Sequence, residues 1–347
     1  MPDSAASSAS DSRGTPSAPD SAAAPPSTIT WRPDILGAGY FAAEMTLAED
    51  EEGPNCATLV RYRPRRWRWL ERKTVVLYMH GWNDYFFQRE LAEFWHEQGA
   101  AFYAIDLRKY GRSLREHQTP GFITDLADYD EEIKLALAAI RQRHGEDARI
   151  VGMGHSTGGL VLSLWTAHHP KNFSALILNS PWLELQGSAF LRTLATPMIS
   201  QLAKLNPKAE LPNIDPGFSA RTMLAEFGGE WEYNRQWRPT PMFEVRAGWL
   251  KAIMAGHAAV ANGLDIDVPI LAMSSAKSHI RPRWSEEMRS ADIVLDANLI
   301  AERALALGPR VTVIRVAGGL HDLVMSRPKV RAWVYDEIAR WSRAYVW

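Results

Sequence analysis

Short apolar runs alternate with longer amphipathic segments along most of this 347-residue chain. The short runs are rich in β-branched and aromatic residues, which is typical of buried strands, and the longer ones have helical spacing. Strands are expected at 41–47, 56–62, 74–79, 102–107, 150–153, 176–179, 268–273 and 310–316. Helices are expected at 87–98, 128–144, 160–165, 297–307 and 330–346. This alternation predicts a doubly wound, mostly parallel α/β sheet.

The alternation stops between residues 181 and 267, where helical pieces at 190–205 and 243–261 are mixed with chain breakers and aromatic residues. We expect a helical cap inserted over the carboxyl edge of the sheet, so that 30–180 and 268–347 form the catalytic domain. The aromatic residues predict an apolar substrate tunnel, although packing of the cap on the core is the alternative for some of them. They are Trp182, Phe218, Phe227, Trp231, Tyr233, Trp237, Phe243 and Trp249.

Residues 1–29 are almost entirely Ser, Ala, Pro, Asp and Gly, a composition that predicts a disordered tail. They lack the apolar core of a secretory signal, and no later window has about 18 uninterrupted apolar residues for a membrane span. With the single cysteine, Cys56, these features favour a cytoplasmic protein without internal disulfides.

The formal net charge of −1 gives no bulk preference for nucleic acid, and at most peripheral membrane contact is expected. Residues 61–73 are strongly basic and contain two tryptophans. Because this segment precedes an expected strand, it should lie opposite the ligand-binding edge of the sheet. We interpret it as a solvated loop. The oligomeric state stays open.

The segment 149–159 reads R-I-V-G-M-G-H-S-T-G-G, a buried strand followed by G-x-S-x-G. In a nucleophile elbow Ser156 takes strained backbone angles, and Gly154 and Gly158 avoid collisions with neighbouring backbone. The N–H of Thr157 then lies at a helix N-terminus, free to stabilise an oxyanion. Taken alone, the motif also fits an ordinary glycine-rich turn.

Two further stretches stand in the order expected for a serine hydrolase. His80-Gly81 closes a strand upstream of the serine, which makes the Trp82 N–H the expected second oxyanion donor. His321 follows the final expected strand on a glycine-rich loop, where the histidine of a Ser…Asp…His order belongs. We therefore expect His321 to be the general base.

The acid must lie between Ser156 and His321, beyond the carboxyl end of a strand. The position directly after the strand at 268–273 offers only Lys277 or Ser278. Asp292 is the expected acid, displaced by an insertion around 279–289, whereas Asp296 is expected to cap the helix at 297–307. Asp296 stays open as the alternative acid.

These motifs resemble the monoacylglycerol lipase and lysophospholipase branch of the α/β-hydrolase superfamily, which includes serine aminopeptidase-like members. The resemblance extends from about Phe41 to the C-terminus and includes the Ser290-Ala291-Asp292 motif. Two features depart from the branch. Trp82-Asn83-Asp84-Tyr85 replaces its usual residues after His-Gly, and its Gly-x-x-Asp is missing at 274–278.

The expected activity is hydrolysis of carboxylic esters, through an acyl-enzyme and without cofactor or metal. The resemblance and the aromatic cap favour medium or long acyl chains, as in monoacylglycerols or lysophospholipids. A small-peptide or amide hydrolase is the alternative, with Glu226, Glu230 and Glu232 as candidates to hold a substrate ammonium. A third reading is an inactive hydrolase fold used for binding.

Overall fold

A computed structural model describes residues 29–64, 73–186, 189–212 and 217–347, and excludes the side chains of 189–195. Within these residues a nine-stranded sheet has the order β1-β2-β3-β5-β4-β6-β7-β10-β11. Its strands are β1 (Arg32–Pro33), β2 (Tyr40–Asp50), β3 (Gly53–Tyr62), β4 (Thr74–Met79), β5 (Ala101–Asp106), β6 (Arg149–His155), β7 (Ala175–Asn179), β10 (Ile270–Ser275) and β11 (Val311–Val316).

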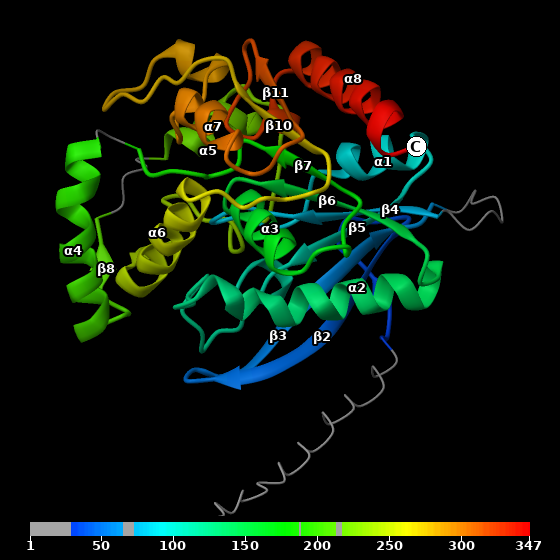
Figure 1. Ribbon diagram of the computed structural model, residues 1–347, viewed down its shortest axis with the longest axis horizontal. Coiled ribbons are helices and arrows are strands. Elements are labelled where there is room, and N and C mark those ends of the chain that lie inside the picture. Colours follow the sequence, from blue (N-terminus) through cyan, green and yellow to red (C-terminus); the bar gives the residue numbers. More distant parts are fainter. Residues whose placement is uncertain (1–28, 65–72, 187–188, 213–216) are drawn as a thin grey trace, which may run out of the picture.

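Only the first part of the sheet is antiparallel. The hairpin β2–β3 projects below the rest of the molecule in Figure 1, and β3 joins the sheet antiparallel to β5. From β5 to β11 every neighbouring pair is parallel. The expected mostly parallel sheet is therefore confirmed.

Helices cover both faces of this sheet because its strand residues alternate between two cores. Leu77 and Met79 of β4 belong to one core, with α2 (Asp130–His144), α3 (Thr157–His168) and α7 (Ala297–Ala304). Val76 and Tyr78 belong to the other core, with α1 (Arg89–Glu97) and α8 (Pro328–Tyr345). This is the doubly wound arrangement that the pattern predicts.

The segment 181–267 contains α4 (Ala189–Leu205), β8 (Glu210–Leu211), α5 (Phe218–Met223), β9 (Val245–Arg246) and α6 (Ala247–Ala261). Helix α6 packs against both α3 and α4 (Figure 1). Helix α6 begins four residues later than expected because Val245 and Arg246 pair with β8. The division into a cap and a catalytic domain stays a prediction.

Three other expectations need adjustment. Strand β10 begins at Ile270 rather than at 268, since Pro269 has no N–H to donate to the ladder. Ile29 packs against the core, so the expected tail cannot include it, and residues 1–28 lie outside the described residues. Arg61 is buried in β3 over the Trp31 ring rather than in a solvated loop, and residues 65–72 lie outside the description.

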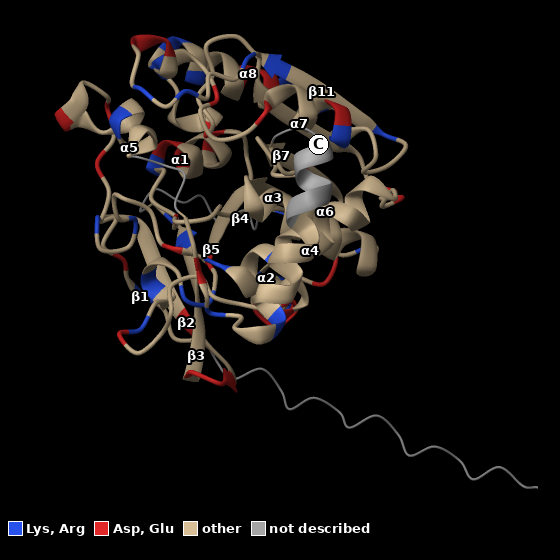
Figure 2. Ribbon diagram, turned by 90° about the vertical axis from the view of Figure 1, so that its left-hand side faces the viewer, with Lys and Arg blue, Asp and Glu red and all other residues tan. Residues whose placement is uncertain are grey.

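Charged residues of both signs are interspersed over the side of the molecule that Figure 2 shows. In the described parts of the chain, every helix is too short or too polar to cross a membrane.

Candidate active site

Ser156 lies at a sharp turn between β6 and α3, with a φ of 51° and a ψ of −117°. The turn explains both flanking glycines. A Cβ on Gly154 would lie 2.7 Å from the Gly158 carbonyl oxygen, and one on Gly158 would lie 2.3 Å from the His80 carbonyl oxygen. Only glycine fits at both positions, so the local geometry is that of a nucleophile elbow.

Gly81 lies directly against this turn, because a Cβ on it would be 2.9 Å from the Ser156 Cβ. Neither the Trp82 N–H nor the Thr157 N–H donates to a main-chain acceptor within the described residues. Thr157 is the first residue of α3, where an N–H has no partner inside the helix. Two N–H groups, one in the loop after β4 and one at the start of α3, are thus available beside the serine.

His80 fixes the orientation of the Trp82 N–H. Its Nε2 accepts from the Leu107 N–H at 3.1 Å, so Nδ1 carries the proton and donates to the Gly81 carbonyl at 2.7 Å. Burial lowers the pKa of His80, which keeps this ring neutral. Because C=O and N–H point in opposite directions across a trans peptide, the Trp82 N–H is turned away from His80.

Ser156, His321 and Asp292 form one hydrogen-bonded chain. The Ser156 Oγ lies 3.0 Å from His321 Nε2, and His321 Nδ1 lies 2.9 Å from Asp292 Oδ2. The Asp292 side chain is fully buried, and its Oδ1 accepts from the N–H groups of Val294 and Leu295 at 2.8 and 2.7 Å. The structure therefore brings these three predicted residues together.

Asp292 reaches the sheet edge despite the insertion before it. The segment returns beside the end of β10, where Asp292 forms an isolated parallel bridge with Ser278. The Ser278 Oγ donates to the Leu295 carbonyl and accepts from the Ala297 N–H. Asp296 accepts from the N–H groups of Asn298 and Leu299 at the start of α7, so its predicted role as a helix cap is confirmed.

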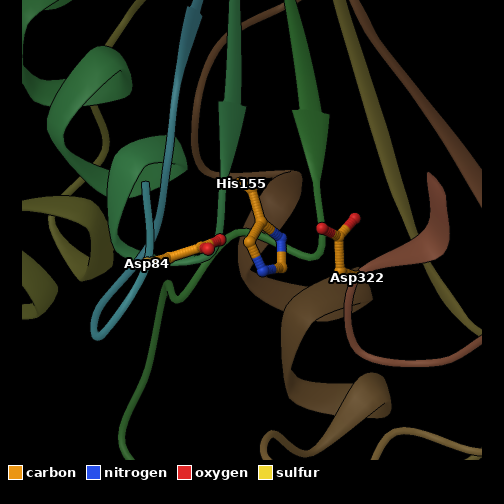
Figure 3. Close-up of side chains that lie close together, drawn as sticks. All are labelled: Asp84, His155 and Asp322. Carbon is orange, nitrogen blue, oxygen red and sulfur yellow. The ribbon is translucent and has the colours of Figure 1, made fainter. Parts of the chain in front are cut away.

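Behind the serine lies a polar cluster that the sequence motifs did not single out. The ring of His155 lies between the carboxyl groups of Asp84 and Asp322, as Figure 3 shows. Burial lowers the pKa of His155 to about 4 and raises that of Asp84 to about 7. The only signal in the sequence was the closeness of these three residues to motif residues: His155 precedes Ser156, Asp322 follows His321, and Asp84 lies two positions after Trp82.

Ligand atoms of Asp84, His155 and Asp322 lie within 4.8 Å of one another, a geometry that could hold a metal ion. Arg238 already provides a cation there, because its Nη1 lies 2.9 Å from Asp84 Oδ1. A metal ion would face this guanidinium, so we assign the cluster no metal role.

Beside Gly81 and Thr157 the expected apolar tunnel is not open. The cavity beside Gly81 and Thr157 measures about 10 Å³, and its wall includes Val161, Trp249 and Ile253. Trp249 fills the space by lying 3.9 Å, centroid to centroid, from the Trp82 ring. Trp249 belongs to the core and Trp182 packs against it, so for these two residues the alternative of packing on the core holds, whereas Phe227 is exposed.

Comparisons with known proteins show to which family the chain belongs. The family described as serine aminopeptidase, S33, matches residues 71–324. A monoacylglycerol lipase of Mycolicibacterium smegmatis is 23% identical over 274 residues, which cover 77% of this chain and 87% of that protein.

Solved structures show the same fold. A soluble variant of the monoglyceride lipase of Saccharomyces cerevisiae has a TM-score of 0.61 at 15% identity, covering 87% of this chain and 94% of that one. A carboxyl esterase of Bacillus coagulans has a TM-score of 0.60 at 13% identity, covering 88% of this chain and 99% of that one. Because the family match covers most of the chain, the protein belongs to the serine aminopeptidase S33 family of α/β-hydrolases.

Proposed function

We propose that this protein is a serine hydrolase of carboxylic esters that acts through Ser156, His321 and Asp292. The single observation that supports this most strongly is the continuous chain from Ser156 Oγ through the His321 ring to the buried Asp292 carboxylate. A nucleophile, a base and an orienting carboxylate at these distances are what acyl transfer needs. The similarity to a monoacylglycerol lipase favours an ester as the substrate.

In the proposed mechanism the Ser156 Oγ attacks the ester carbonyl carbon while His321 Nε2 accepts the hydroxyl proton. The N–H groups of Trp82 and Thr157 stabilise the negative charge on the carbonyl oxygen. His321 then protonates the leaving alcohol, and an acyl group stays on Ser156. Water, deprotonated by the same histidine, releases the acid, and Asp292 stabilises the imidazolium in both steps.

We propose medium or long acyl chains, because the wall beside the two N–H groups is apolar. Leu107, Val161 and Ile253 line it, together with Trp249. An acyl chain longer than the present cavity requires Trp249 to move, and each buried methylene then adds up to about 0.8 kcal/mol of binding free energy. Monoacylglycerols and lysophospholipids are the substrate classes to test first. Location in the cytoplasm stays a prediction.

The glutamates that could hold a substrate ammonium, Glu226, Glu230 and Glu232, give the amide alternative little support. Glu226 pairs with Arg235, and Glu230 pairs with Arg331, so both carboxylates already have cations. All three glutamates of this group are exposed, and an exposed carboxylate would hold a substrate ammonium only weakly.

The test is labelling with a fluorophosphonate, followed by hydrolysis of p-nitrophenyl esters of increasing chain length, monoacylglycerols and aminoacyl amides. We expect Ser156 to be labelled and the Ser156→Ala variant to be folded but inactive and unlabelled. Ester hydrolysis that survives in Ser156→Ala would overturn the proposal. A preference for aminoacyl amides would favour the peptidase, and an unlabelled wild-type protein would favour a binding role.

A further inference from the structure

We propose that Asn179 and Asp322 are positioning residues, which together hold Ser156 and His321 at hydrogen-bond distance. This inference rests on the proposed function, since it assigns a task to two residues that do not touch the substrate carbonyl. Both are buried, at 3% and 2% exposed, and both lie next to segments that carry predicted catalytic groups.

The main chain of Asn179 holds the nucleophile turn. Asn179 is the last residue of β7, and its carbonyl oxygen accepts from the Ser156 N–H at 3.0 Å. The same carbonyl lies 3.1 Å from Nδ1 of His155. The positions of the Ser156 backbone and of the His155 ring are therefore set by the end of one strand.

The side chain of Asn179 holds the histidine loop. Its Nδ2 donates to Asp322 Oδ1 at 2.6 Å, and its Oδ1 accepts from the Leu323 N–H at 3.1 Å. These two residues directly follow His321 in the chain. One residue thus binds the serine turn through its main chain and the histidine loop through its side chain.

Asp322 completes the connection. Its Oδ1 also accepts from the Val324 N–H, and its Oδ2 accepts from the side chain of Gln88, which immediately precedes α1. The carboxylate therefore ties the loop to β7 and to the start of α1 at once. A loop held on two sides has little freedom to carry His321 away from Ser156.

The ring of His155 provides the third support. It packs against the ring of His321 with centroids 4.9 Å apart, while its own Nδ1 faces the Asn179 carbonyl. Figure 3 shows Asp322 on one side of this ring. By holding the His155 ring, the Asn179 carbonyl also helps to position the ring of His321 that packs against it.

The arrangement predicts an effect on turnover rather than on substrate binding. Proton transfer needs Ser156 Oγ and His321 Nε2 at hydrogen-bond distance, and a displacement of about 1 Å can cost about 10²-fold in rate. Substitution of Asn179 or Asp322 leaves the substrate contacts unchanged, because neither residue touches the substrate carbonyl. We expect kcat to fall about 10²-fold in Asn179→Ala and in Asp322→Ala, with KM within about threefold of wild type.

The experiment is a double-mutant cycle on the full chain, read as kcat, KM and the rate of fluorophosphonate labelling. Because both side chains serve one connection, the double variant should be no more than about threefold slower than the slower single variant. Two unrelated defects would multiply to about 10⁴-fold, and that result would overturn the proposal.

A conservative variant separates hydrogen bonding from charge. The amide oxygen of Asp322→Asn can still accept from Asn179 and Val324, and only the bond from Gln88 is lost, because an NH2 group cannot accept it. We therefore expect kcat within about fivefold of wild type. Equal losses in Asp322→Asn and Asp322→Ala would contradict the proposed positioning. Serine variants at both positions replace the alanine variants if these do not fold.

A matched control lies at the opposite end of β7. Asn172 precedes that strand, and its side chain joins Arg141 to the His169 carbonyl. Asn172→Ala should lower the melting temperature but leave kcat unchanged. Failure of the wild-type protein to hydrolyse esters or to be labelled would count against the proposed function, whereas unchanged kcat in the Asn179 and Asp322 variants would count against the positioning role alone.

Discussion

The carboxyl edge of the sheet and the segment 181–267 are held in different ways. At the edge, polar side chains bind main-chain groups of the segments that follow the strands, as Asp292 binds the N–H groups of Val294 and Leu295. In the segment, aromatic rings such as Trp249 and Trp182 pack on one another, with centroids 5.9 Å apart. The indole nitrogens of Trp82 and Trp182 are buried and have no hydrogen-bond partner among the residues that the structure describes.

This difference implies a division of tasks. Hydrogen bonds are directional and fix donor and acceptor positions closely, as proton transfer requires. Aromatic packing is less directional and tolerates rearrangement at moderate cost. Substitutions at the sheet edge should therefore change kcat, whereas substitutions in the segment should change the choice of substrate and the stability.

The largest effect is expected at Asp292. In the proposed mechanism the Asp292 carboxylate fixes the His321 tautomer and stabilises the imidazolium, so kcat of Asp292→Asn should fall on the order of 10⁴-fold. Steady-state kinetics with a p-nitrophenyl ester measures this. Near-normal turnover in Asp292→Asn would reject its role as the acid and reopen the question of Asp296.

A smaller loss is expected at His80, which orients the Gly81–Trp82 peptide. His80→Ala frees that carbonyl, and partial loss of one oxyanion donor should lower kcat by about 10²-fold. His144→Ala is the control, because His144 ends α2 and its ring contacts the Tyr103 hydroxyl instead. Equal kcat losses in the two variants would show that the His80 effect is not specific to the oxyanion site.

Trp249 tests the other side of the comparison. Trp249→Ala enlarges the cavity beside Thr157, so kcat/KM for dodecanoyl over butanoyl esters should rise by roughly tenfold or more, since each buried methylene adds up to about 0.8 kcal/mol. Trp333→Ala on the exposed surface of α8 should leave that ratio unchanged. An unchanged ratio in Trp249→Ala would place the acyl chain elsewhere.

His257 on α6 should make the protein acid-sensitive. Burial lowers its pKa to about 4, below the ordinary value of 6.5. Between pH 6.5 and about 4, His257 is therefore protonated in the unfolded chain but neutral in the folded protein. The free energy of unfolding decreases as the pH falls through this range. His257→Gln, which can still donate to the Trp182 carbonyl, should raise the melting temperature at pH 4.5 by on the order of 5 °C.

The control for His257 is the comparison of wild type and His257→Gln at each pH of the series. As the pH falls, the lowered pKa of His155, about 4, makes its burial destabilise the fold in the same pH window. The raised pKa of Asp84, about 7, has the opposite effect on the stability of the fold. Both groups are present in the wild type and in His257→Gln, so their effects cancel in the comparison. Above pH 6.5 the two melting curves should run parallel. A parallel shift at all pH values in His257→Gln would contradict a titration effect.

The smallest effect is expected at Asp296, which caps α7. Asp296→Ala should lower the free energy of unfolding by about 1 kcal/mol and leave kcat unchanged. Chemical denaturation and the ester assay together measure both. A fall in kcat comparable to that of Asp292→Asn would show that the two aspartates have exchanged roles.

The sequence by itself determined the elements and the order of the motifs. Strand and helix patterns are local, and Gly154 must be glycine because of Gly158 in the same five-residue motif, whereas the clash at Gly158 is with the distant His80. Ser156 and His321 could be named as candidates because each follows a strand whose carboxyl end reaches the same edge. Asp296 could be named as a cap because capping depends only on the next three residues.

Tertiary structure decided what depends on distant contacts. The bridge between Ser278 and Asp292 brings a carboxylate across an insertion, and no local pattern contains that pairing. The contact from Asn179 to Asp322 joins residues 143 positions apart. Whether aromatic side chains line a tunnel or fill it depends on their three-dimensional packing, which periodicity does not encode.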